Sequence, residues 1–370
     1  MVYNKVLGFL SCLCAIPSFL YAEEQGAWRV VQNYQQRTFP SSVPAGNYSG
    51  LAHLQDDIYA VVSDKSDSAL YFNFQILVNK ETGELENVKC LGFSSRINKA
   101  FSLLEAKRQE ERGYDLEAIA KVSDSTVVVS SEGKAFLKEY PVVTLEGKSL
   151  ASRTSGLWFQ EFKASDFYPN YIFESLAYDS REKKLWTISE STMRKDGECS
   201  TSENGVANKL RLMAFDWEKP GSHPLYRSYA YLMDEPTIKR KAQTYVMGVS
   251  DLCILEDGLL LVLEREAFVP KSKLGAFCNC KLYLVNPSEA TCFPMTESFS
   301  DTTQYLKKKL LLEWKTTLSL FGRSFANYEG MCLGPKLVNG DQVVILVSDS
   351  QDQYAGVLKD WFKTIVISKE

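Results

Sequence analysis

Short apolar runs and polar turns alternate along most of this chain, and one form of the alternation occurs five times. In each case an acidic or small polar residue precedes a short apolar strand, a turn follows, and a second β-rich strand ends in an acid. The turns contain pairs such as Asp179-Ser180 and Asn339-Gly340, which favour tight connections. Each repeat is therefore predicted to be a β-hairpin. The five hairpins span residues 49–64, 117–132, 174–190, 251–264 and 329–349.

The strands of these hairpins are apolar on both faces, as residues 127–129 and 343–347 show. A strand that is buried on both faces belongs inside a stack of sheets. Further β-rich segments follow the hairpins and supply two outer strands for a repeat. They are 70–78 with 86–91, 209–217 with 226–232, and 281–285 with 292–296. The repeat therefore predicts an all-β fold, a β-propeller of five four-stranded blades.

The two ends of the chain and two irregular stretches complete this prediction. Only residues 363–368 follow the last hairpin, so residues 28–34 are expected to supply the missing strand and to close the ring. The stretches Lys99 to Arg112 and Asp301 to Leu318 are rich in Leu, Lys, Glu and Arg and predict short helical insertions. A sixth, degenerate blade within residues 291–324 is the alternative.

Residues 1–22 have the form of a secretory signal peptide, with Lys5 ahead of an apolar stretch. An uncleaved anchor is disfavoured because Pro17 interrupts that stretch. We expect residues 23–370 to form a single exported domain, periplasmic or extracellular, because no Pro-, Gly- or Ser-rich linker divides them. No membrane span is expected after cleavage. The formal net charge of −4 gives no reason to expect a nucleic-acid partner.

Nine cysteines are present, and two of them, Cys12 and Cys14, lie in the leader. A hairpin centred on Asn286 would place Cys280 opposite Cys292, close enough for a disulfide. A shift of the turn by one residue would favour Cys278 with Cys292 instead.

The acids of the repeat carry the candidate chemistry. In an antiparallel hairpin the first residue of one strand meets the last residue of the other. Because all inner hairpins of a propeller point the same way, these acids are predicted to gather at one mouth of the central channel. Gathered carboxylates raise one another's pKa or require cations. The predicted pairs are Glu117 with Glu132, Glu174 with Glu190, Asp251 with Glu264, and Glu329 with Asp349, whereas Ser49 replaces the acid of the first repeat.

Oxygen ligands suit a hard ion such as Ca²⁺, and sulfur and imidazole ligands are scarce in these hairpins. Lys and Arg side chains beside several acids could neutralise the oxygens of a phosphate ester. The alternative is that single acids fix turns and single cations form surface salt bridges. The candidate catalytic residues are Glu117, Glu174, Glu329 and Asp349. The candidate cation ligands are Asp64, Glu132, Glu190, Asp251 and Glu264, and the candidate substrate-binding residues are Lys65, Lys134, Arg194, Arg265 and Arg323.

From about Gly46 to the C-terminus, the chain resembles the esterase-like phytase family. The matching segments are 115–120 with 131–133, 173–177 with 189–191, 229–232, 250–252 with 263–265, and 327–331 with 347–349. The resemblance implies a propeller and a phosphoesterase activity. Where the family often has Asn soon after the last Ser-Asp, this chain has Ser350-Gln351, a departure at that part of the site.

Two functions compete on this basis. The first is a secreted, metal-dependent ester hydrolase that acts on phosphate esters, with the acids holding cations and orienting water. The second is a non-catalytic propeller that binds a small ligand or a protein through the same acidic mouth. In a third interpretation the acids are purely structural.

Overall fold

The computed structural model describes residues 27–64, 70–93, 115–132, 137–142, 162–218, 223–320, 322–351, 353 and 358–370. The predicted leader at 1–22, the predicted helix at 99–112, and the side chains of Lys65 and Lys134 lie outside the described residues.

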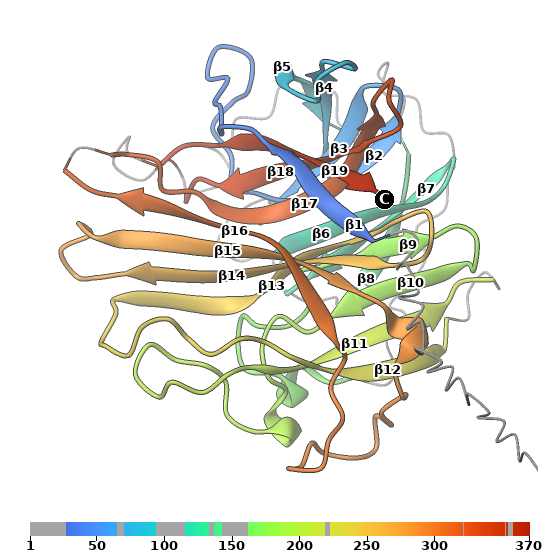
Figure 1. Cartoon of the computed structure of the whole chain (residues 1–370), viewed down its shortest axis with the longest axis vertical. Coiled ribbons are helices and arrows are strands. Elements are labelled where there is room, and N and C mark those ends of the chain that lie inside the picture. Colours follow the sequence, from blue (N-terminus) through green and yellow to red (C-terminus); the bar gives the residue numbers. More distant parts are fainter. Residues whose placement is uncertain are drawn as a thin grey trace, which may run out of the picture.

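The described residues form five antiparallel sheets (Figure 1). The first contains β2 (Tyr48–Gln55), β3 (Ile58–Ser63), β4 (Phe72–Val78) and β5 (Leu85–Phe93), and the second contains β6 (Leu116–Ser123), β7 (Thr126–Ser131) and β8 (Leu137–Pro141). The third contains β9 (Ala177–Asp179), β10 (Lys184–Ile188), β11 (Lys209–Asp216) and β12 (Leu225–Leu232). The fourth contains β13 (Thr244–Ile254), β14 (Leu260–Val269), β15 (Ala276–Val285) and β16 (Lys308–Leu318). The fifth contains β17 (Asn327–Lys336), β18 (Gln342–Asp349), β19 (Phe362–Lys369) and β1 (Trp28–Asn33). Three short 3-10 helices lie at Ala164–Asp166, Arg194–Asp196 and Pro287–Glu289.

The first strand of each hairpin is the innermost strand of its sheet, and these strands form a closed ring. β2 contacts β6, β6 contacts β9, β9 contacts β13, β13 contacts β17, and β17 contacts β2. The backbones approach closely at Gly330, where an added Cβ would lie 2.7 Å from the carbonyl oxygen of Ser49. Glycine is therefore required at that position. The predicted five-bladed propeller is confirmed for the part of the chain that the structure describes.

The N-terminal strand closes the ring as predicted. β1, drawn in blue, runs beside the red β19 (Figure 1), with Trp28 opposite Lys369 and Val30 opposite Ile367. The indole Nε1 of Trp28 also donates to Asp257 of the fourth sheet at 2.8 Å. The last blade therefore holds both ends of the described chain.

The predicted helix at residues 301–318 is wrong, because Lys308–Leu318 forms the outer strand β16. Its composition favours a helix, but residues 312–316 alternate between less and more exposed positions, which is the period of a strand. Pairing with β15 places Trp314 opposite Cys280. The predicted sixth blade is also wrong for the described residues 291–320, since their one named strand belongs to the fourth sheet.

The disulfide prediction fails for the same reason. β15 pairs with β16 and not with residues 292–296, so neither Cys278 nor Cys280 faces Cys292. Cys278 and Cys280 are buried, Cys292 is exposed, and all three are free thiols. The sulfur atoms of Cys278 and Cys280 lie 3.6 Å apart.

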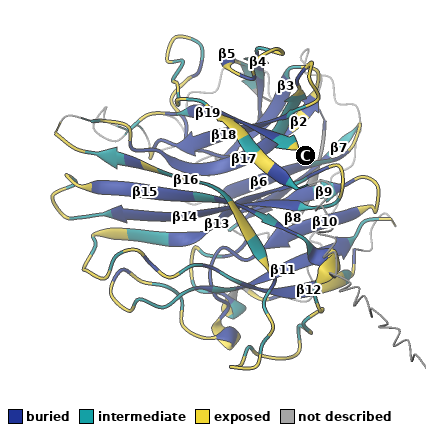
Figure 2. Cartoon of the chain, viewed as in Figure 1, coloured by how far each residue is buried: buried dark blue, intermediate teal, exposed yellow. Residues whose placement is uncertain are grey.

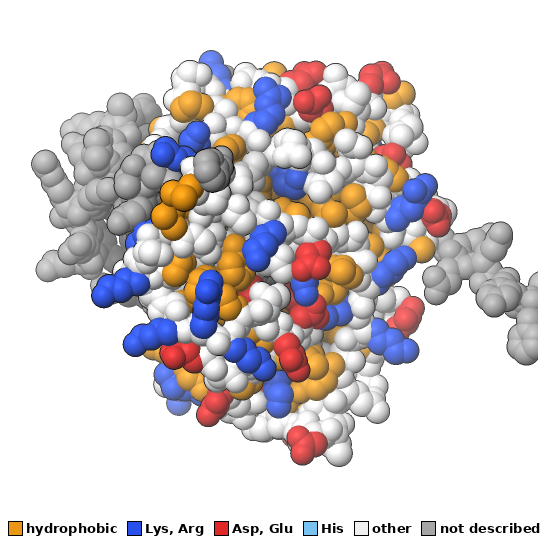
Figure 3. All heavy atoms as spheres, turned by 60° about the vertical axis from the view of Figure 1, so that its left-hand side comes forward, with side chains coloured by type: hydrophobic (Ala, Val, Ile, Leu, Met, Phe, Trp, Pro, Cys, Tyr) orange, Lys and Arg blue, Asp and Glu red, His pale blue; other side chains and the backbone are white. Residues whose placement is uncertain are grey.

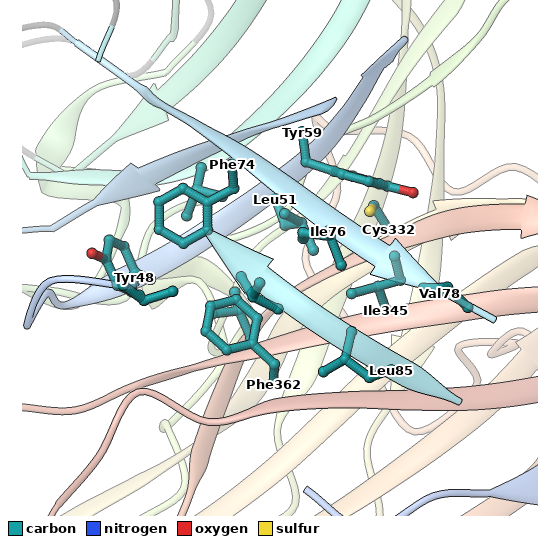
Figure 4. Close-up of a cluster of buried hydrophobic side chains, with 14 of the residues drawn as sticks. Tyr48, Leu51, Tyr59, Phe74, Ile76, Val78, Leu85, Cys332, Ile345 and Phe362 are labelled. Carbon is teal, nitrogen blue, oxygen red and sulfur yellow. The ribbon is translucent and has the colours of Figure 1, made fainter. Parts of the chain in front are cut away.

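Apolar side chains fill the spaces between neighbouring sheets. Leu51 and Phe74 of the first sheet pack against Ile345 and Phe362 of the fifth (Figure 4). Inner strands are buried and exposed residues are found mainly in connections and outer strands (Figure 2). No helix within the described ranges is long and apolar enough to cross a membrane.

Candidate functional site

One end of the ring opens into a pocket of about 640 Å³. It lies on the side where β14 ends and β15 begins, at the left of Figure 1. Seven carboxylate side chains line it, together with the cationic side chains of Arg265 and Lys273. The carboxylates are Asp64, Asp115, Glu117, Glu132, Glu174, Glu190 and Glu329. The predicted gathering of acids at one mouth is therefore present for six of the sequence candidates, and Asp115 is added to them.

Bulges in the inner strands aim the first acid of a repeat at the pocket. The register shifts between Leu116 and Ile119, and again between Tyr328 and Gly330. Glu117 and Glu329 lie in these bulges, where the extra residue leaves the ladder and re-aims its side chain. Directly beside Glu132 lies Asp115, whose carbonyl oxygen accepts from the amide of Glu132 at 2.9 Å.

Arg265 on β14 forms hydrogen bonds with several side chains at the base of the pocket. Its guanidinium donates through Nη2 to Glu174 at 2.7 Å and to Glu190 at 3.0 Å, and through Nη1 to Glu329. Nη1 also donates to the side-chain oxygen of Asn327 at 3.1 Å. The residue is 3% exposed. One buried cation thus contacts two acids that flank the inner strands of the third sheet and one acid on β17 of the fifth.

Burial raises the pKa values of several acids in the pocket. Burial, together with the charges of Asp64 and Asp115, raises the pKa of Glu117 well above its usual value. Burial and the charge of Glu190 raise the pKa of Glu132 to about 8. Burial also raises the pKa of Glu174, although Arg265 opposes the shift. The pocket therefore favours either bound protons or a bound cation.

The arrangement of oxygens fits a cation. Asp115, Glu117 and Glu132 offer oxygens within 4.8 Å of one another, as do Glu132, Glu174 and Glu190. Glu190 is fully buried, and its Oε2 has no hydrogen-bond partner among the described residues. The neighbouring Glu174 carboxyl could donate to that atom only when protonated. An all-carboxylate set with a buried, unsatisfied oxygen suits a hard divalent ion.

The sequence itself matches a known family over the same elements. Residues 43–351 match the family model described as "Phytase-like: Esterase-like activity of phytase". The chain belongs to this family. No curated protein matches the chain.

Solved propeller structures also show similarity, at low identity. A streptogramin B lyase structure is 9% identical over 91% of this chain and 98% of that chain, with a TM-score of 0.33. The Dos1 propeller is 9% identical over 86% of this chain and 67% of that chain, with a TM-score of 0.29. The WD40 domain of SCAP from fission yeast is 13% identical over 93% and 98% of the two chains, with a TM-score of 0.19. The fold assignment therefore rests on the sheets described above.

Three of the predicted acids in this phytase-like chain are not among the lining residues, and two of them, Asp251 and Glu264, have other partners. Asp251 is buried on β13, and its carboxylate accepts from its neighbour Leu252 at 2.8 Å and from the amide of Met331 on β17 at 2.6 Å. It ties two inner strands together. Glu264 accepts from Tyr231 of the third sheet and from Lys308 of β16, both at 2.6 Å.

Strand alternation explains the position of Glu264. Successive side chains of β14 point to opposite faces, so Glu264 and Arg265 separate. The chain's pattern of closing acids therefore indicated residue 264, whereas residue 265 is the one that reaches the pocket.

Asp349 lies next to the pocket floor rather than in its wall. Burial and the charge of Glu329 raise its pKa well above the usual value. The amide of Gln351 donates to Asp349 at 2.7 Å, and the Gln351 side chain donates to the same carboxylate. Gln351, in the Ser350-Gln351 segment that follows the last Ser-Asp, itself lines the pocket.

The other predicted cations do not reach this pocket's lining. Arg194 donates to the carbonyl of Phe167 at 2.7 Å and stacks over Tyr168. Arg323 is exposed in the connection before β17. Lining residues that sequence reasoning missed include Asp115, Asn327 and Lys273. Asp115 and Asn327 each precede the first acid of a repeat by two residues. This shared spacing could have identified both as pocket residues from the sequence.

Proposed function

We propose that this chain is an exported hydrolase of phosphate esters that depends on a divalent cation, with Ca²⁺ as the ion that best suits its ligands. The observation that carries the proposal is one pocket in which seven carboxylates face the two cations Arg265 and Lys273. Arg265 is engaged by Glu174, Glu190 and Glu329, and a bound divalent cation would supply positive charge to the carboxylates around Glu117.

Asp115, Glu117 and Glu132 are the residues that would hold the cation, since their oxygens lie close together at the pocket wall. When bound, a divalent cation polarises a phosphoryl oxygen and offsets the negative charge that develops on it. Without a cation, an anionic ester would be repelled by this wall.

Arg265 has a positioning role in this proposal. It binds oxygens of Glu174 and Glu329 and fixes both carboxylates at the floor of the pocket. A carboxylate held in this way can orient a water molecule and accept its proton. Its Nη atoms donate to the protein's own acids, so Arg265 acts on the substrate through those acids.

Export is proposed from the signal-like residues 1–22 and agrees with membership in a family of exported proteins. N-terminal sequencing of the protein recovered outside the cytoplasm should begin near residue 23.

The test of the hydrolase is metal analysis of the purified mature protein, followed by a panel of phosphomonoesters and phosphodiesters with Ca²⁺ or a chelator. We expect bound cation and turnover that the chelator abolishes. Glu117→Gln should lower kcat/KM on the order of 100-fold or more, because it removes a ligand of the cation. Glu256→Gln is the matched control, since Glu256 is an exposed acid that pairs with Lys336 away from the pocket.

A bound cation without turnover of any ester would contradict the hydrolase and favour the binding module. Full turnover by Glu117→Gln would show that the acidic wall has no part in the reaction.

A further inference from the structure

The pocket has a second chemical character that the acids do not explain. The wall formed by the fourth sheet and the segments around β17 is apolar. Its side chains come from β13, β14, β15, β16 and two connections, and they include Val246, Val269, Ala276, Leu318, Phe325 and Leu358. We call these six residues the apolar wall. It faces the same cavity as the carboxylates.

The apolar surface continues outward at the rim. Leu274 is 48% exposed and Leu320 is 75% exposed. The turns that carry them are joined, because the amide of Gly275 donates to the carbonyl of Leu318 at 2.9 Å. Figure 3 brings this side of the molecule forward and shows hydrophobic side chains in the middle of the face, interspersed with Lys, Arg, Asp and Glu side chains.

The described part of the pocket lining carries few cationic side chains for a ligand with many negative charges. Among its described lining residues the cationic side chains are Arg265 and Lys273, and Arg265 already contacts three carboxylates. Each additional phosphate group would therefore face an excess of acids. One phosphate group at a cation, next to an apolar surface, matches the lining better. A volume of about 640 Å³ lies in the range of pockets that enclose drug-sized ligands.

We propose that the substrate is a phosphate ester of an apolar alcohol, with one phosphate group at the acidic wall and its alkyl or aryl group against the apolar wall. This proposal rests on the proposed hydrolase function. A polyphosphorylated polar alcohol is the substrate class that it disfavours. Hydrolysis would transfer the phosphoryl group to water, release the apolar alcohol, and leave inorganic phosphate at the acidic wall.

The test uses two series with the Ca²⁺-loaded mature protein. Straight-chain alkyl phosphates of increasing length, below their micelle-forming concentrations, report kcat/KM, and the matching non-hydrolysable alkyl phosphonates report Kd by calorimetry. Both kcat/KM and affinity should rise by about 3- to 4-fold for each methylene that the wall buries, and then level off. A phenyl ester should exceed the methyl ester, and inositol hexakisphosphate should be the weakest substrate.

Two variants on the same strand locate the effect. Leu318→Ser should flatten the dependence on chain length, because Leu318 lines the pocket. Leu310→Ser should leave it unchanged, because Leu310 is an exposed residue of β16 that is not among the pocket's lining residues.

The outcomes separate the two proposals. Length-dependent phosphonate binding without turnover of any ester would contradict the hydrolase and support the apolar ligand class. Turnover that is equal for all chain lengths, or greatest for the polyphosphorylated ester, would overturn the substrate class and leave the hydrolase standing.

Discussion

Replacing Arg265 with Gln removes the charge that contacts Glu174, Glu190 and Glu329. Loss of one partner from a buried ion pair costs about 3–5 kcal/mol, because the remaining charge is left uncompensated. Here three carboxylates lose the same partner, but they can take up protons, which limits the cost. We therefore expect the free energy of unfolding to fall by about 3–5 kcal/mol in chelated protein at neutral pH.

Urea unfolding of the variant with a chelator and with saturating Ca²⁺ measures this directly. A divalent ion can replace the lost charge, so Ca²⁺ should restore about 2 kcal/mol or more. Arg211→Gln is the control, because Arg211 is equally buried and contacts the single carboxylate of Asp196 at 2.6 and 2.7 Å. It should be destabilised with no added recovery by Ca²⁺. Equal recovery of the two variants, or an Arg265→Gln loss below about 1 kcal/mol, would refute the reasoning.

Three further predictions concern pH, packing and thiols. The pKa of Glu132 is raised from 4.5 to about 8 in the folded protein, so the unfolded chain loses this proton at a lower pH than the folded protein does. The free energy of unfolding of the chelated protein should therefore fall as the pH rises between these two values. The contribution of Glu132 to this slope should be at most about 1.4 kcal/mol per pH unit, and Glu132→Gln should remove it. An unchanged slope in the variant would exclude this residue as a cause. Gly248→Ala should lower the free energy of unfolding by about 1–3 kcal/mol and weaken Ca²⁺ binding, because the added Cβ would lie 2.6 Å from the backbone oxygen of Glu190. In Gly322→Ala the added Cβ would lie 3.2 Å from the Ser319 hydroxyl, so this variant should unfold in urea almost as the unmodified protein does. A thiol reagent should label Cys292 in the native protein, whereas Cys253, Cys278, Cys280 and Cys332 should react only after denaturation; native labelling of these four would contradict their burial.

The hairpin repeat was sufficient to predict the propeller, because each inner strand carries an apolar pattern that only stacked sheets can bury. It also predicted the closure by residues 28–34, since the last repeat lacked one strand and the N-terminal segment was the remaining candidate. β16 was predicted as a helix because its composition favours one. It forms a strand because it pairs with the edge of β15 and because exposure alternates along residues 312–316.

The sequence predicted which kinds of side chain gather at the site, but it did not predict how they are arranged. Six of the nine predicted acids do converge on the pocket. The bulges that aim Glu117 and Glu329 depend on contacts between neighbouring strands. The roles of Glu264 and Arg265 depend on which face of β14 each side chain occupies, and a shift of one position exchanges them. The apolar wall comes from separate strands and connections that no local pattern relates.

The measurement that tests the central claim most directly is a crystal structure of the mature protein grown with Mn²⁺ in place of Ca²⁺, with anomalous diffraction recorded for the metal. We expect an anomalous peak bounded by the carboxylates of Asp115, Glu117 and Glu132, which is lost in crystals of Glu117→Gln. A protein that hydrolyses phosphate esters in a Mn²⁺-dependent manner but shows no peak among these three carboxylates would contradict it.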